Sequence, residues 1–193
     1  MKKLLVLVCA TAALSLAAGS AFADSIKGRV GVTGKIGFTI PADGDFGPNN
    51  NSTDTDNGFI GGAGVIYGVD NTIAVEADIT RSTFGSNIGD FDVIDLALGA
   101  QYRFALSQPQ LVPFVGAGLD FLMTDADGGN DVDNTFGVHA KAGVDYFLTK
   151  QLALTAEAKL LVAPDADING PTGRGNFDPT SLSTTVGVRY FFN

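Results

Sequence analysis

The stretch from Thr135 to Val162 holds two alternating runs of residues that are joined by a very short turn. In the first run one face is apolar from Phe136 to Tyr146, and the other face mixes glycine with charged residues. The second run repeats this pattern from Leu152 onward. A period of two over this length indicates β-strands longer than those of ordinary globular proteins. Such strands are typical of a barrel wall that separates lipid from a polar interior.

The N-terminal segment has the pattern of an export signal. Two lysines precede an apolar run over residues 4–18, and Ala21-Phe22-Ala23 then matches an A-x-A cleavage site. We therefore expect a cleaved signal peptide over residues 1–23 and one barrel domain over residues 24–193. A membrane helix is disfavoured because the run is short. A lipoprotein signal at Cys9 is disfavoured because it would cut the apolar region short.

Eight alternating runs follow one another along the chain, and they predict an all-β fold: an eight-stranded, antiparallel, up-and-down transmembrane β-barrel. The runs are Ile26–Ile40, Gly58–Val69, Thr72–Phe84, Asp92–Ala105, Leu111–Thr124, Thr135–Leu148, Gln151–Ala163 and Ser181–Phe192. Longer and shorter connections alternate between them, which predicts short periplasmic turns, longer outer loops and both termini on the periplasmic side. We therefore expect the protein in the outer membrane of a Gram-negative-type bacterium.

Aromatic residues recur near the predicted strand ends, as expected where rings prefer the boundary between lipid and water. The first predicted girdle, at the periplasmic side, consists of Tyr67, Tyr102, Tyr146, Tyr190 and Phe192, with Phe104 and Phe147 beside them. The second, at the outer rim, consists of Phe38, Phe59, Phe84, Phe91, Phe121 and Phe136.

If the apolar face points to lipid, the opposite face of each strand must line the lumen. The charged and titratable residues predicted to line it are Arg29, Lys35, Glu76, Asp78, Asp95, Arg103, Asp120, His139, Lys141, Asp145, Glu157, Lys159 and Arg189. Their acids and bases nearly balance, which indicates paired charges, because a buried charge must be paired or hydrated. A soluble lipocalin-type barrel would have an apolar interior instead.

Four inward positions are apolar, namely Ile66, Phe114, Leu122 and Leu161. They could line a small apolar pocket, or they could fill space beside inward glycines. The second interpretation is favoured because an eight-stranded barrel is narrow.

The sequence gives weaker evidence for individual functional sites than for the fold. His139, the one histidine, could be a pH switch or a ligand, but a hydrogen-bonded packing role near Lys141 is favoured. The segment 125–133 begins like a calcium loop but lacks the required glycine and glutamate. No motif indicates a metal, a cofactor or a catalytic nucleophile, so we expect no enzyme. The net charge of −9 argues against nucleic acid as a partner.

The outer loops are rich in aspartate, which suggests loose bridging by divalent ions to anionic lipopolysaccharide, although simply solvated loops are favoured. The aspartates are Asp43, Asp45, Asp54, Asp56, Asp90, Asp92, Asp125, Asp127, Asp131, Asp133, Asp165, Asp167 and Asp178.

Three segments carry a resemblance: Pro113–Phe121, Phe136-Gly137 leading to Ala142–Tyr146, and the closing Val186–Phe192. Together they resemble the outer membrane protein W (OmpW) family, within the wider OmpA/OmpX-like group of eight-stranded barrels. The resemblance implies a monomeric barrel that admits small hydrophobic molecules and has a lateral route to the membrane. The closing run also resembles the recognition strand of outer-membrane barrels, so periplasmic chaperones and the barrel-assembly machinery are expected partners, besides outer-membrane lipid and lipopolysaccharide.

Two functions stay open at this point. The barrel is either a narrow channel or binding barrel for small hydrophobic solutes, or a closed structural or surface-interaction barrel. In the second case it acts through the acidic loops Pro41–Asn57 and Pro164–Thr180.

Overall fold

The computed structural model describes residues 26–41, 44–46, 51–53, 58–86, 89–108, 110–126, 130–132, 134–164, 166–170, 173–177 and 179–192. The signal peptide that we predict over residues 1–23 lies outside them. No helix in the described part of the chain is long and apolar enough to cross a membrane.

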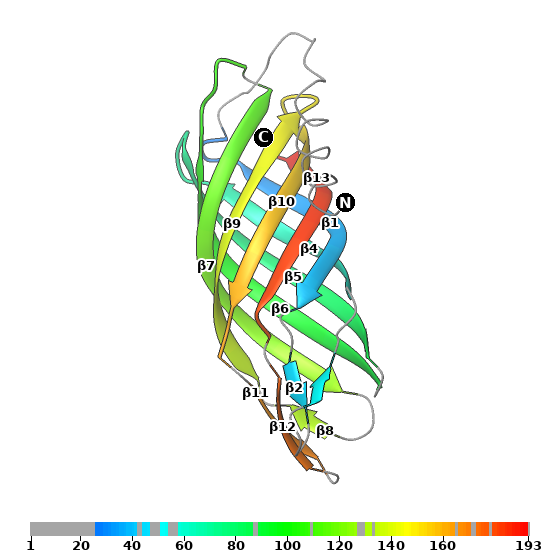
Figure 1. Ribbon diagram of the computed structural model, residues 1–193. Coiled ribbons are helices and arrows are strands. Elements are labelled where there is room, and N and C mark those ends of the chain that lie inside the picture. The colour runs from blue at the N-terminus through cyan, green and yellow to red at the C-terminus, as the bar shows by residue number, and fades with distance from the viewer. Residues whose placement is uncertain are drawn as a thin grey trace.

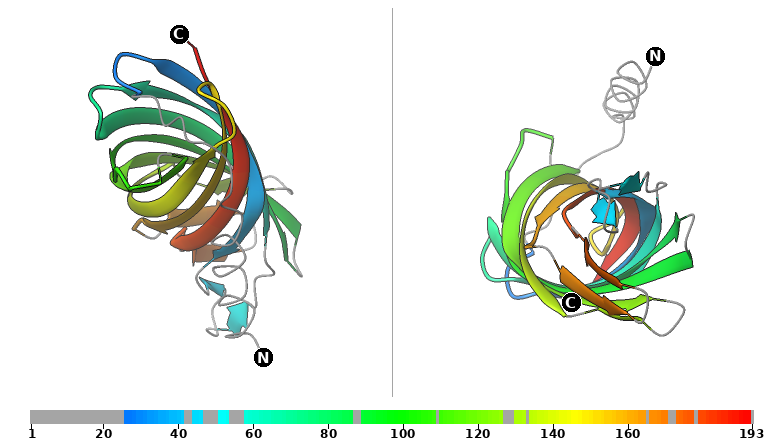
Figure 2. Two further views of the ribbon diagram at one scale, coloured as in Figure 1. Left: turned by 90° about the horizontal axis from the view of Figure 1, so that it is seen from above. Right: turned by 60° about the horizontal axis from the view of Figure 1, so that its bottom comes forward.

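Eight antiparallel strands form one closed barrel, which confirms the predicted fold class (Figures 1 and 2). The barrel strands are β1 (Val30–Pro41), β4 (Gly58–Gly68), β5 (Ile73–Ser86), β6 (Gly89–Arg103), β7 (Leu111–Ala126), β9 (Thr135–Phe147), β10 (Leu152–Val162) and β13 (Ser181–Phe191). Each strand pairs with the next, and β1 also pairs with β13, so this last pairing closes the wall.

The two ends of the barrel differ. The start of β1 and the end of β13 lie side by side at the upper end in Figure 1, which we call the terminal end. Five short strands extend beyond the opposite end, which we call the loop end (Figure 1). They are β2 (Gly44–Phe46), β3 (Asn51–Thr53), β8 (Asn130–Val132), β11 (Ala166–Gly170) and β12 (Gly173–Phe177).

The sequence predicts loops over these five strands, because strands of three to five residues are too short to display a period of two. It also predicts a loop over residues 85–91, whereas β5 and β6 continue to pair until Ser86 meets Gly89. A third difference concerns the first run. It was expected to begin at Ile26, but β1 begins only at Val30, and Ile26 instead lies inside the barrel, 4 % exposed.

Burial alternates along the strands as the sequence pattern predicts. In β1 every second residue from Gly31 to Thr39 is buried, and the residues between them are exposed. The exposed set contains the large aliphatic and aromatic side chains, such as Ile36, Phe38 and Leu98. A wall with its apolar side chains outward and its polar ones inward suits a lipid environment.

Asp70 closes the tight turn between β4 and β5. Its carboxylate accepts hydrogen bonds from the backbone N–H groups of Thr72 and Ile73, at 2.7 Å each, and from the Thr72 hydroxyl at 3.0 Å. These donors, the Thr72 backbone N–H first, hold the pKa of Asp70 below its usual value. The turn is thus fixed by a side chain that replaces a backbone partner.

Inward glycines make room for the large interior side chains. A Cβ added at Gly118 would clash with the Leu98 carbonyl oxygen and would lie 2.6 Å from Cε1 of His139. A Cβ at Gly143 would lie 2.5 Å from Cζ of Phe114. An eight-stranded barrel is only wide enough for side chains to fill it, so a bulky residue on one strand needs a gap on the next.

We expect Gly118→Ala to destabilise the barrel by roughly 1–3 kcal/mol, because the new methyl group overpacks a filled interior. Gly34→Ala is the matched control, since a Cβ there would meet nothing within 4 Å. Urea unfolding in lipid vesicles measures both changes. Equal free energies of unfolding for the two variants would contradict the packing argument.

Candidate functional site

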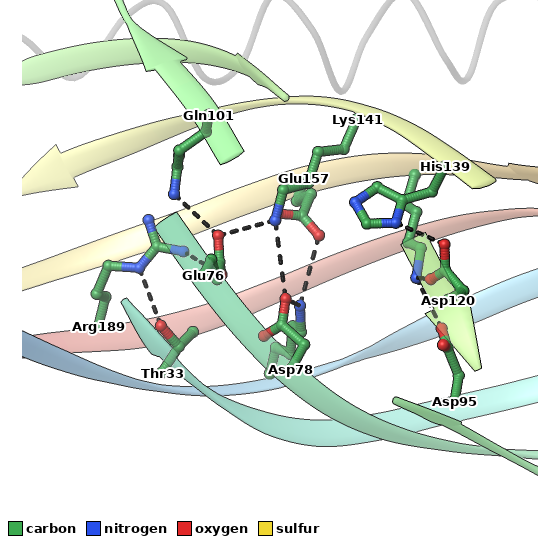
Figure 3. A network of polar contacts seen from close by, with 12 residues as sticks. Thr33, Glu76, Asp78, Asp95, Gln101, Asp120, His139, Lys141, Glu157 and Arg189 are labelled. Atoms are coloured by element: carbon green, nitrogen blue, oxygen red, sulfur yellow. Dashed lines mark hydrogen bonds and ion pairs between the residues drawn. The ribbon is translucent and has the colours of Figure 1, made fainter. Parts of the chain in front are cut away.

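The interior of the barrel holds its charged side chains in three tiers. Along β9 the inward residues run from Asp145 near the terminal end, through Lys141, to His139 nearer the loop end. The terminal tier consists of Glu76, Arg103, Asp145 and Arg189. The middle tier consists of Lys35, Asp78, Lys141 and Glu157. The loop-side tier consists of Asp95, Asp120, His139 and Lys159. Figure 3 shows ten members of this network and its close partners as labelled sticks.

In the terminal tier two guanidinium groups share one carboxylate oxygen. Arg103 Nη2 and Arg189 Nη1 each lie 2.8 Å from Oδ2 of Asp145. Arg189 also lies 3.0 Å from Oε1 of Glu76, and its Nε donates to the Thr33 hydroxyl at 2.9 Å. These contacts join strands β1, β5, β6, β9 and β13 across the barrel. Arg189, 1 % exposed, is the centre of the tier.

An aromatic ring completes the terminal tier. The Phe114 ring centroid lies 6.0 Å from the Arg103 guanidinium carbon and 5.7 Å from that of Arg189. Gln101 donates to Oε2 of Glu76 at 2.8 Å. Each guanidinium therefore meets both a carboxylate and an aromatic face, which offsets part of the cost of removing it from water.

The middle tier is a square of two lysines and two carboxylates. Lys35 Nζ lies 3.0 Å from Asp78 and 3.5 Å from Glu157. Lys141 Nζ lies 3.3 Å from Glu157 and 3.7 Å from Asp78. It also lies 2.8 Å from Glu76, so it connects the middle and terminal tiers.

The loop-side tier centres on Asp120, which is 1 % exposed. Nδ1 of His139 lies 2.6 Å from Oδ2 of Asp120. Lys159 Nζ pairs with the other oxygen of Asp120 and lies 2.7 Å from Asp95. The sequence predicts a hydrogen-bonded packing role for His139 near Lys141. The hydrogen bond is present, but its partner is Asp120.

An apolar plug lies on the terminal side of the tiers. This terminal plug consists of Ile26, Ile66, Ala74, Phe147, Ala153 and Phe191. The rings of Phe147 and Phe191 stack with their centroids 5.8 Å apart. The prediction that Phe147 joins the periplasmic tyrosine girdle is wrong, because its position on β9 shares the parity of Asp145 and points inward, 3 % exposed.

Arg29 lies at the rim rather than in the lumen. Its guanidinium donates to the Lys150 carbonyl at 2.9 Å, and its Cζ lies 5.3 Å from the Phe191 ring centroid. It is only half-buried. Arg29 precedes β1, which begins at Val30. The alternation along that strand therefore does not predict the environment of Arg29.

The four inward apolar residues do not gather around one pocket, which corrects that hypothesis. Ile66 belongs to the terminal plug, and the Phe114 ring lies against the guanidinium groups of Arg103 and Arg189. Leu122 and Leu161 pack with Val93 and Ala163 near the loop end. A cavity of about 40 Å³ lies there, lined partly by Leu122, Leu161, Lys159 and Asp95.

The aromatic residues of the wall lie in two groups. At the terminal end Tyr102 packs against Phe104, with centroids 5.0 Å apart, and Tyr190 packs against Phe192 at 5.2 Å. Tyr67 is exposed and Tyr146 is half-buried at the same end. Nearer the loop end are the pairs Phe38–Phe59 and Phe121–Phe136, at 6.2 Å and 4.9 Å. The side chains of Phe84 and Phe91 lie outside the description.

Several uncharged polar residues of the interior are missing from the predicted lumen set, because that set contains only titratable and apolar residues. Besides Gln101 and Thr33, the hydroxyl residues that line the interior are Thr39, Thr80, Ser82, Thr155, Ser183 and Thr185. The period of two would have found them, since each has the parity of a charged neighbour on its strand. Within the described residues no group of three or more His, Cys, Asp or Glu side chains is arranged to hold a metal ion.

We expect Arg189→Ala to destabilise the barrel by roughly 3–5 kcal/mol, because it leaves Glu76 and Asp145 short of a buried partner. Arg81→Ala is the control. Arg81 pairs with Asp92 on the exterior, where its side chain is 64 % exposed, so its loss should cost under about 1 kcal/mol. Urea unfolding in vesicles measures both, and a small effect at Arg189 would mean that the terminal tier contributes little.

Comparison with known proteins places the chain in a family. Residues 9–190 match the family model described as the outer membrane protein beta-barrel domain. No curated protein sequence matches the chain.

Several solved structures share the fold. OprG from Pseudomonas aeruginosa is 15% identical, with 89% of this chain and 99% of that chain covered and a TM-score of 0.71. Neisserial surface protein A is 20% identical, with 84% and 97% covered and a TM-score of 0.69. Outer membrane protein W from E. coli is 20% identical, with 86% and 98% covered and a TM-score of 0.54. The fold is therefore that of a small OmpW-like barrel, and the chain belongs to the outer membrane protein beta-barrel domain family.

Proposed function

We propose that this outer-membrane barrel is closed along its axis and acts through its loop end rather than as a conduit. The observation that carries the proposal is the filled interior, in which three charged tiers follow one another on the loop side of an apolar plug. Under this proposal the charged interior residues pack and stabilise the barrel and catalyse no reaction.

Size favours a closed barrel over a solute channel. The cavity near the loop end has a volume of about 40 Å³. A dry apolar cavity that binds benzene measures about 150 Å³, and a single water needs roughly 10–15 Å³. The cavity thus has room for a few waters but not for a small hydrocarbon.

The free-energy cost of separating buried ion pairs also favours a closed barrel. A solute that crossed the terminal tier would have to separate Arg189 from Asp145 and Glu76, all of which are almost fully buried. Breaking one buried pair costs roughly 3–5 kcal/mol, and the middle tier would have to open as well. The terminal plug would remain as a further barrier.

The loop end offers an ordered surface for contacts. The loop that follows β7 and the loop that follows β10 meet there, because β8 pairs with both β7 and β11. Strand β12 pairs with β11, so the three short strands β8, β11 and β12 extend the sheet from the end of β7. We propose that the loop end faces outward and that the aspartates of its loops, several of which lie outside the described residues, are bridged by divalent ions to lipopolysaccharide.

Binding of small hydrophobic solutes is the second candidate. It is supported by the apolar residues Val93, Leu122 and Leu161 beside the loop-end cavity. This function would require the cavity to widen, so it predicts binding from the loop end and not passage through the barrel.

We expect the purified protein to produce no stepwise current in planar lipid bilayers, because the tiers and the plug close the lumen. Arg29→Gln provides the control for contaminating porins, since it changes the charge at the mouth of this lumen and leaves the three tiers intact. A current whose size or ion selectivity changed in that variant would belong to the barrel and overturn the proposal.

Replacing residues 42–57 and residues 165–178 with short turns should leave a folded barrel, because the wall strands pair without them. Cosedimentation with lipopolysaccharide vesicles containing Mg²⁺ should fall in these variants. The full-length protein should lose the same retention when a chelator is added. Unchanged retention in both experiments would refute the bridging role of the loops.

A further inference from the structure

Five hydroxyl side chains line one side of the cavity at the loop end. They are Thr39 of β1, Thr80 and Ser82 of β5, and Ser183 and Thr185 of β13. None of these residues is more than 8 % exposed. Within the described part of the chain, none of their hydroxyl groups makes a hydrogen bond to another protein group. A buried hydroxyl without a partner is costly, so this side of the cavity suits a molecule that donates and accepts hydrogen bonds.

The register of the strands places these hydroxyl groups beside the loop-side tier. Thr39 is paired with Ser183 across the seam between β1 and β13. Ser183 is also paired with Lys159 of β10, and Thr80 is paired with Asp95 of β6. The polar side of the cavity is therefore built from strands that are distant in the sequence and adjacent in the wall.

The charged groups that line the cavity already have partners in the protein. Lys159 lies 2.7 Å from Asp95, and Lys35 lies 3.5 Å from Glu157. An ion that bound here would have to compete with these buried pairs, and breaking a buried pair costs free energy. The cavity therefore favours an uncharged ligand.

The opposite side of the cavity is apolar. Val93 of β6, Leu122 of β7 and Leu161 of β10 line it and belong to one hydrophobic cluster. A ligand whose hydroxyl groups face β1, β5 and β13 can place its carbon atoms against these three side chains. A pure hydrocarbon suits only the apolar side, because it leaves the hydroxyl side without partners.

The cavity reaches the loop end of the barrel wall. Pro41, the last residue of β1, and Ser181, the first residue of β13, both line it. On its other side the middle tier and the terminal plug close the lumen. A ligand of this cavity therefore enters and leaves at the loop end.

We propose that the cavity is a binding site for small uncharged molecules that carry hydroxyl groups. Its volume of about 40 Å³ has room for about three waters, at roughly 10–15 Å³ each. Three waters fill about 90 Å³ of liquid, which is the bulk of a two-carbon diol. Binding here requires neither passage through the barrel nor the acidic loops, so its test is independent of the closed-barrel proposal.

Ethylene glycol and xenon distinguish the two ligand classes, because both are small and only the glycol carries hydroxyl groups. With the ¹⁵N-labelled barrel in lipid nanodiscs, we expect ethylene glycol to shift the amide signals of Thr80 and Thr185 saturably, with a dissociation constant on the order of 1 mM. Xenon, which enters dry apolar cavities, should give no saturable shift at these residues. A saturable response to xenon, or a glycol response that does not saturate, would overturn the proposal.

Thr39→Val combined with Ser183→Ala removes two paired hydroxyl groups and should weaken glycol binding about tenfold or more. Thr184→Val is the matched control, because Thr184 is the exposed neighbour of Ser183 on β13 and faces away from the lumen. The control should bind glycol as the wild type does. A double variant that binds glycol as tightly as the wild type would contradict the proposed role of the hydroxyl groups. If the double variant does not fold, the comparison of glycol with xenon on the wild type decides alone.

Discussion

The structure depends on one constraint: a charge buried inside a narrow barrel must meet an opposite charge on another strand. Glu76 is the clearest case, since it contacts Arg189 from β13, Lys141 from β9 and Gln101 from β6. Such contacts span the lumen, whereas backbone hydrogen bonds only join neighbouring strands. The tiers therefore hold together parts of the wall that the sheet itself does not connect. Removing one partner leaves the others in a medium that cannot hydrate them.

The glycines belong to the same arrangement. Gly143 lies opposite Phe114, and Gly118 lies beside His139. Each gap on one strand receives a long side chain from its neighbour, so the interior is filled without widening the wall. Charge pairing and steric fit thus select the same residues, which explains why the lumen alternates between glycine and long polar side chains.

Much of the fold could be predicted because both the wall and its environment impose a period of two. The strand from Thr135 to Phe147 was predicted to within a residue, and the inward parity of Lys141 and Asp145 followed from it. Pairing across the lumen could not be predicted, because it depends on barrel tilt and strand stagger rather than on alternation. The positions of Ile26 and Arg29 were predicted incorrectly because both residues precede Val30, where β1 begins, and alternation applies only within a strand. The strands beyond the loop end were missed because they are too short for any period to emerge.

The terminal plug has a consequence for the order of folding. Ile26 comes from the beginning of the described chain and Phe191 from its end, yet the two belong to the same apolar cluster. Their strands, β1 and β13, form the pairing that closes the barrel. The plug can be completed only once these distant ends have met. The pairing of β1 with β13 and the assembly of the plug are therefore completed together. A partly assembled wall would hold its arginines and carboxylates open to water, and the final pairing would remove that water in a single step.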